Sequence, residues 1–146
     1  MGNKYYTPTI EEFHVGFEYE TYELYETPNR WKINIFGEEH MELDHIVFLL
    51  MEHPDMIRVK YLDKEDIESL GWEFNYNMSV VSQLYYLYEK KGYDLSVWYR
   101  KEGLLLVIRK VNKSSDNIVV HSHSIFYGYI KNKSELKILL KQLGIE

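Results

Sequence analysis

The sequence contains no cysteine, only three prolines and no long apolar run. The absence of cysteine excludes disulfides, thiolate nucleophiles and cysteine-based zinc sites. The longest apolar run, Ile46 to Met51, is far too short to span a bilayer, so we expect no membrane segment. The first residues, Met1 to Tyr6, also lack the apolar stretch of a signal peptide. These absences together predict a soluble protein that suits a reducing compartment such as the cytoplasm.

The signature motifs of common catalytic sites are missing as well. The sequence holds neither of the glycine-rich phosphate loops, GxGxxG and GxxxxGK[ST], and no GxSxG nucleophile elbow. Carboxylate pairs such as Glu18/Glu20 and Asp63/Asp66 fit an exposed strand face and a helix cap better than a catalytic cleft. We therefore expect no catalytic residue, no cofactor and no metal site.

The chain has 146 residues, of which 45% are hydrophobic. This length and composition predict a single globular domain, residues 1–146, with its own core. Residues 1–72 hold 16 acidic and 6 basic side chains, a balance of −10, whereas residues 73–146 hold 7 and 11, a balance of +4. Either the two halves neutralise each other, within the fold or between subunits, or the basic half meets an anion.

Three strands are predicted in the last third of the chain, over residues 93–100, 104–111 and 118–130. The first two are joined by Lys101-Glu102-Gly103, which has the length of a hairpin loop, and the last two by a polar loop. Because a parallel pair needs a long crossover, these neighbours are expected to be antiparallel.

A closing helix is predicted after these strands. Asn132 is a suitable N-cap, Glu135 follows three residues later, and Gly144 suits the end of the helix. One apolar stripe lies between them at helical spacing, formed by Leu136, Leu139, Leu140 and Leu143. We expect this stripe to pack across one face of the sheet.

An N-terminal hairpin is predicted before residue 36. Apolar and polar residues alternate from Phe13 to Glu20, in a strand that is expected to run on to about Tyr25, and again around Trp31, Ile33 and Ile35, as in strands with one buried face. The turn residues Thr27-Pro28-Asn29 lie between them. The solvent-facing side chains of the hairpin are expected to be Glu18, Glu20, Lys32 and Asn34.

A helix is predicted next, over residues 39–53, where apolar residues recur at helical spacing and Pro54 forbids continuation. Phe48, Leu49 and Met51 widen its apolar surface beyond one stripe. A helix of this kind is either buried on two sides or used as an interface.

A short strand over residues 57–62 and a brief helix follow. Asp63 is the expected cap of that helix, with Asp66 three residues on and Gly71 at its end.

The tyrosine-rich run at residues 85–88 is predicted as a strand paired with residues 93–100, although helical spacing over residues 80–91 gives an alternative. Together these elements predict an α+β fold. It has a mainly antiparallel sheet of about five to six strands, two or three helices, and the C-terminal helix packed on the sheet.

Candidate ligand-binding residues gather in the basic, tyrosine-bearing last third. Arg100 and Arg109 lie in consecutive predicted strands, where a guanidinium can bind phosphate while a ring such as Tyr127 stacks on a base. The alternative is that these cations guard strand ends against edge pairing. His121 and His123 are two apart on one strand, so both rings point to one face. They lack a predictable third metal ligand, and surface histidines are the alternative. We expect these five residues on the sheet face that the closing helix leaves open.

Three blocks of the sequence carry a resemblance: residues 5–20, residues 57–72 and residues 130–145. The second reads Ile-Arg-Val-Lys-Tyr-Leu-Asp-Lys-Glu-Asp-Ile-Glu-Ser-Leu-Gly-Trp. These blocks resemble a family of uncharacterised short proteins from bacteriophages and bacterial mobile elements. The family supplies no catalytic or ligand residue. The resemblance implies a phage-encoded accessory protein that acts in the cytoplasm of the host cell.

The leading functional hypothesis is a non-catalytic protein that binds a host protein and thereby counters a defence system. A sponge for a small anionic nucleotide signal is the alternative, and a phosphodiesterase-like enzyme using His121 and His123 is a second one. The expected partner is thus a host protein or a small anionic ligand, with homo-oligomer formation as a further expectation. The overall acidity argues against extended nucleic acid.

Overall fold

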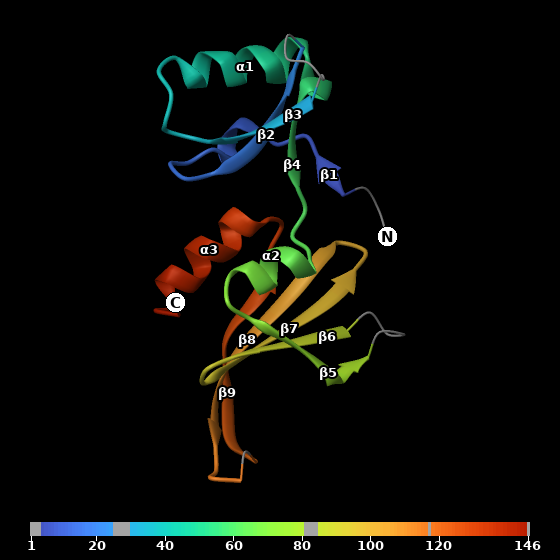
Figure 1. Cartoon of the computed structure of the whole chain (residues 1–146), viewed down its shortest axis with the longest axis vertical. Helices are drawn as coiled ribbons and strands as arrows, with labels where there is room; N and C mark the ends of the chain where they lie inside the picture. The colour runs from blue at the N-terminus through green and yellow to red at the C-terminus, as the bar shows by residue number, and fades with distance from the viewer. Residues whose placement is uncertain (1–3, 25–29, 81–84, 117, 146) are drawn as a thin grey trace. The chain divides into compact units, whose positions relative to one another are not determined.

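The computed structural model describes residues 4–24, 30–80, 85–116 and 118–145 (Figure 1). The chain divides into two compact units. Unit 1 comprises Met1–Tyr61 with Asn132–Ser134, and unit 2 comprises Leu62–Lys131 with Glu135–Glu146. The single domain over residues 1–146 stays a prediction. Within the described ranges, no helix combines the length and apolar character needed to cross a bilayer.

Unit 1 is an antiparallel sheet with one α-helix across it. The described strands follow the order β1-β4-β2-β3. The elements are β1 (Tyr5–Tyr6), the 3-10 turn η1 (Ile10–Glu12), β2 (Glu18–Glu23), β3 (Arg30–Ile35), α1 (Glu42–Glu52), the 3-10 turn η2 (Pro54–Met56) and β4 (Ile57–Lys60). The inner face of α1 packs on the sheet in a core of Phe17, Tyr19, Ile46, Leu49, Ile57 and Val59 (Figure 1). The sequence predicted this helix, and it ends where Pro54 forbids continuation.

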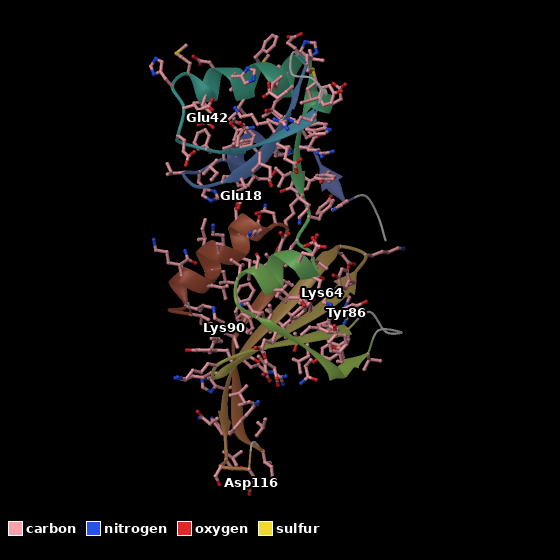
Figure 2. The ribbon with its side chains drawn as sticks, in the orientation of Figure 1. Glu18, Glu42, Lys64, Tyr86, Lys90 and Asp116 are labelled. Carbon is pink, nitrogen blue, oxygen red and sulfur yellow. The ribbon has the colours of Figure 1, made fainter. Side chains whose placement is uncertain are left out.

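The start of α1 is fixed by a buried carboxylate. Glu42 is 7% exposed (Figure 2). Its Oε2 accepts a hydrogen bond from the Tyr19 hydroxyl at 2.5 Å, and its Oε1 accepts one from the Gly37 backbone N–H at 2.7 Å. Burial, followed by the hydrogen bond to Glu42, raises the pKa of Tyr19 well above its ordinary value. Glu42 therefore ties the first turn of α1 to β2 and to the turn after β3.

The predicted outer face of the N-terminal hairpin is wrong for its second strand, β3. Glu18 and Glu20 lie opposite Ile35 and Ile33, whereas Lys32 is opposite Thr21 on the other face. Directly opposite residues share a face, so the two isoleucines accompany the glutamates, and Ile33 is 67% exposed. A register change of one residue moves every side chain of a strand to the other face, and alternation within each strand does not fix that register.

The first predicted strand also begins too early. Its expected residues from Phe13 to Phe17 form a turn, and β2 begins at Glu18. Gly16 adopts a positive φ of 93° in this turn, and Val15 is 81% exposed. The expected turn at residues 27–29 and the expected strand end at Tyr25 lie outside the described residues.

Unit 2 is an antiparallel sheet with helices on one face, and its described strands follow the order β5-β6-β7-β8-β9 (Figure 1). Its elements are α2 (Lys64–Ser69), β5 (Glu73–Val80), β6 (Tyr85–Lys90), β7 (Tyr93–Arg100), β8 (Gly103–Lys113), β9 (Val119–Tyr129) and, from Glu135 on, α3 (Lys133–Gln142). The predicted α+β class with antiparallel pairing is confirmed, and the strands are divided between two sheets. The tyrosine-rich run is a strand paired with β7, as predicted.

The helices of unit 2 follow their predicted signals. The Asp63 side chain accepts a hydrogen bond from the Asp66 N–H at 2.9 Å, and Gly71 takes a positive φ of 91° after the helix. At the closing helix, Gly144 has a φ of 73°. The α3 stripe is buried on the sheet, in a core that includes Trp72, Tyr88, Leu95, Val97, Leu106, Ile108, Leu136 and Leu140. We call this the α3 face of the sheet and the opposite side its open face.

The outer halves of β8 and β9 form an arm. The first residue of β7, Tyr93, pairs with Lys110, so β8 beyond that point pairs only with β9. Asp116 lies at the tip of the arm (Figure 2). Ile118, Val119 and Val120 on this arm are 62%, 50% and 65% exposed.

Candidate functional site

The two candidate arginines lie on one face of the unit 2 sheet but far apart. Arg100 is opposite Gly103, and Arg109 is opposite Asp94. Gly103 and Arg109 are six positions apart along β8, which is roughly 20 Å along a strand. One small ligand therefore does not reach both guanidinium groups.

The candidate histidines lie on the other face. Tyr127 is opposite Val107 and belongs to the open face with Arg109, whereas His123 is opposite Lys110 on the α3 face. The cause is a bulge between Ile108 and Arg109, where one extra residue of β9 exchanges the faces of everything before it. The structure thus does not bring the five candidates together.

The two histidine rings do lie near each other. The centroids of His121 and His123 are 5.6 Å apart, and both side chains are exposed on the arm. Among the described residues, no group of three or more histidine, aspartate and glutamate side chains is placed to hold a metal ion.

Arg109 is committed to an internal ion pair. Its Nη2 lies 3.7 Å from Oδ2 of Asp94, which is 8% exposed. Burial raises the pKa of Asp94, and the Arg109 guanidinium opposes that rise. The Arg109 Nε is buried and has no hydrogen-bond partner among the described residues. The arginine is therefore held in the sheet by a carboxylate rather than presented to a ligand.

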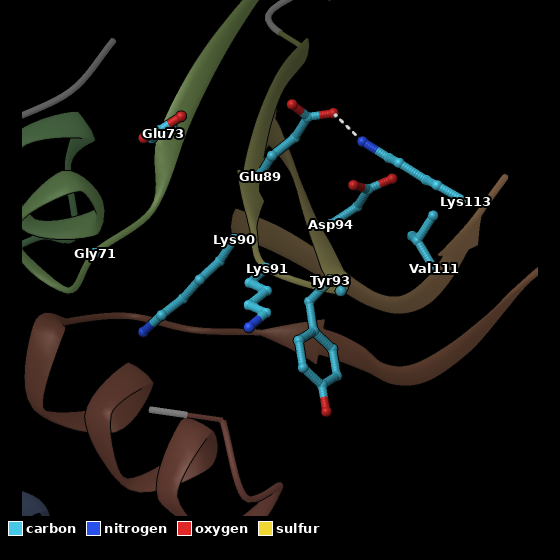
Figure 3. A pocket seen from close by; sticks show the side chains of 10 residues that line it. Gly71, Glu73, Glu89, Lys90, Lys91, Tyr93, Asp94, Val111 and Lys113 are labelled. Atoms are coloured by element: carbon cyan, nitrogen blue, oxygen red, sulfur yellow. Dashed lines mark ion pairs between the residues drawn. The ribbon is translucent and has the colours of Figure 1, made fainter. Parts of the chain in front are cut away.

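A cavity of about 600 Å³ lies at the β6–β7 turn, with Glu73, Glu89, Asp94 and Lys113 among its lining residues (Figure 3). Lys113 Nζ is 3.6 Å from Oε1 of Glu89, and Arg109 pairs with Asp94. Lys90 and Lys91 extend away from these carboxylates in Figure 3, and Lys90 Nζ donates to the Leu70 carbonyl at 3.0 Å. The cavity offers paired charges of both signs.

The helix α1 has a second apolar stripe on the side away from the sheet. We call it the outer face of α1, and it consists of Leu43, Val47, Phe48 and Met51. These side chains are 51%, 38%, 52% and 74% exposed, whereas Ile46 and Leu49 on the inner face are 0% and 5% exposed. The sequence indicated this surface through Phe48 and Met51. The structure assigns Leu49, the third residue of that signal, to the core.

The surroundings of this stripe are acidic. Asp44 and Glu52 on α1 and Glu38 just before it are exposed. Unit 1 as a whole holds 12 acidic and 6 basic side chains, a formal balance of −6, and unit 2 holds 11 of each, a balance of 0. The net charge of the chain therefore resides in unit 1.

A scan of protein-family models, a search of curated proteins and a search of solved structures each found no match to this chain.

Proposed function

We propose that this protein is a non-catalytic binding protein that captures a partner protein on the outer face of α1. The observation that carries the proposal is the exposure of four apolar side chains at helical spacing, on a helix whose opposite face already fills the core. An amphipathic helix with a second apolar stripe suits the groove of a partner, because its side chains insert as a row of anchors. Phenylalanine and methionine are also enriched at protein interfaces, and methionine adapts to irregular surfaces.

Charge defines the partner further. The acidic rim and the −6 balance of unit 1 favour an apolar groove bordered by lysine and arginine. Pairing of two copies through α1 is disfavoured, because it would bring the same acidic rims together.

The resemblance of three sequence blocks to short phage and mobile-element proteins supports a host protein as the partner. We accordingly propose that the chain captures this host protein in the host cytoplasm and thereby counters a defence system. The small-ligand sponge has less support, because Arg109 and Tyr127 lie on the face opposite to His121 and His123. The phosphodiesterase has less support, because the two histidines, although 5.6 Å apart, lie on the face opposite to both arginines.

The test is affinity capture from host extract with the full chain and two variants. Phe48→Ser/Met51→Ser removes the two most exposed anchors of α1, and Ile33→Ser is the control, since Ile33 is 67% exposed on the sheet face that α1 does not cover. The proposal expects a stoichiometric partner with the wild type and with Ile33→Ser, and its loss with Phe48→Ser/Met51→Ser. Retention of the partner by the double variant refutes it.

Sedimentation of the purified wild type tests the remaining possibility, that two copies of the chain pair through α1. A wild-type dimer that Phe48→Ser/Met51→Ser converts to a monomer assigns the outer face of α1 to a second copy of this chain. That result also refutes the proposed partner.

A further inference from the structure

Aromatic side chains line up across the open face of the unit 2 sheet. Tyr85 pairs with Trp98, Trp98 with Leu105, and Leu105 with Tyr129. Directly opposite residues share a face, so these four side chains form one row across β6, β7, β8 and β9, which we call the aromatic row. The ring centroids of Tyr85 and Trp98 are 4.3 Å apart, and Tyr129 is 53% exposed. Tyr127, one row away, is 72% exposed.

One end of the row lies beside a cation. Arg100 is exposed, and its Cζ lies 5.4 Å from the centroid of the Trp98 ring. The residue opposite Arg100 is Gly103, and a Cβ placed there would lie 3.8 Å from the Tyr129 ring. Gly103 has a φ of 134°, which strongly favours glycine. The Tyr129 ring therefore lies within contact distance of Gly103, the residue opposite Arg100.

We propose that this face binds a short single-stranded oligonucleotide, with bases stacked on Trp98 and Tyr129 and a phosphate between them bound by Arg100. Four neighbouring strands span roughly 14 Å between the outer ones, which suits two or three bases rather than one. Every base has an aromatic face, so such a platform tolerates many sequences. A guanidinium beside the rings favours an anionic ligand over an uncharged sugar.

The distribution of charge removes the main objection to nucleic acid. The acidity that argued against it belongs to unit 1, whereas unit 2 is formally neutral. The open-face carboxylates Glu73, Glu89 and Asp94 lie in one row across β5, β6 and β7, and Asp94 is four residues along β7 from Trp98, roughly 13 Å away. Asp94 is paired with Arg109, and Glu89 with Lys113. The turn after Arg100 carries Lys101 and Glu102, which offset each other.

The experiment is fluorescence anisotropy of an end-labelled oligothymidylate titrated with the full chain and its variants. Tyr129→Ala is expected to weaken binding by about 5- to 150-fold, the effect of losing one stacked base. Tyr129→Phe retains the ring and is expected to bind as the wild type does. Tyr76→Ala is the matched control, because Tyr76 is 75% exposed on β5 and its ring contacts Phe74 of the α3 face.

Arg100→Gln gives a second, independent readout. Loss of one phosphate contact lowers the slope of log affinity against log salt by about 0.7 for a single strand. Unchanged affinity in Tyr129→Ala together with an unchanged slope in Arg100→Gln overturns the proposal. Absence of binding at about 1 mM protein, beyond the weak end of non-specific binding, also overturns it. If a mononucleotide displaces the oligonucleotide at equal concentration, the ligand is a small nucleotide, and the proposed single-stranded oligonucleotide is refuted.

Discussion

The buried carboxylate of Glu42 provides the sharpest test of how α1 is held. Glu42→Ala leaves two donors without an acceptor, the Tyr19 hydroxyl and the Gly37 N–H. Tyr19 is 4% exposed, so water does not readily replace the lost acceptor. The unsatisfied Tyr19 hydroxyl costs about 1–3 kcal/mol, and this is the cost expected for the variant, because the Gly37 N–H belongs to an exposed residue that water reaches. Tyr19→Phe alone removes one hydrogen bond to a charged group and is expected to cost about 1.5–3 kcal/mol.

The double variant separates this hydrogen bond from packing. In the Tyr19→Phe background no hydroxyl is left unsatisfied, so Glu42→Ala costs less there, by roughly 1–3 kcal/mol. Because the chain has two compact units, the free energy of opening is measured in unit 1 itself, from native-state hydrogen exchange of the Ile46 and Leu49 amides. Costs that add within about 0.5 kcal/mol would refute the claim that this bond holds α1 to the sheet.

Further predictions concern both units. Ile46→Ala is expected to destabilise unit 1 by about 2–5 kcal/mol in hydrogen exchange, whereas the exposed Phe48→Ser changes it by less than about 0.5 kcal/mol. Burial raises the pKa of Tyr88 above its ordinary 10.0, so stability present below pH 10 is lost as the pH rises further, and Tyr88→Phe should flatten that loss in alkaline urea titrations. Arg109→Gln should raise the pKa of Asp94 further above 3.8 in a carboxyl NMR titration, and a lowered pKa would contradict the ion pair. Because a raised carboxyl pKa makes stability fall as pH rises between the two values, the variant should widen that window.

Local signals predicted the helices well. Asp63 and Asp66 form the expected cap, Gly71 and Gly144 end their helices, and Pro54 stops α1. Each of these signals acts within a few residues, so the sequence alone contains it.

The pairing of strands that are distant in the chain was harder to predict from the sequence. The register between β2 and β3 places Ile33 beside Glu20 on the outer face, whereas Lys32 and Asn34 were predicted there, and alternation fits either register. The two-residue strand β1 has no counterpart among the predicted strands, because two residues carry no periodic pattern.

In the candidate site, too, local features could be predicted from the sequence and features that depend on strand register could not. The exposed surface of α1 was indicated by Phe48 and Met51, since helical spacing reveals a surplus apolar stripe. The sequence did not indicate that His123 and Tyr127 lie on different faces, because the bulge in β9 that exchanges the two faces has no sequence signal. The aromatic row likewise depends on the register of four strands, which brings Trp98 and Tyr129 into line.

The most direct test of the central claim is hydrogen exchange of the full chain alone and with its captured partner. We expect slowed exchange in α1, centred on Leu43 to Met51, because the outer face of that helix is covered in the complex. Protection confined to other segments, such as the β8–β9 arm, with α1 unchanged, would contradict it.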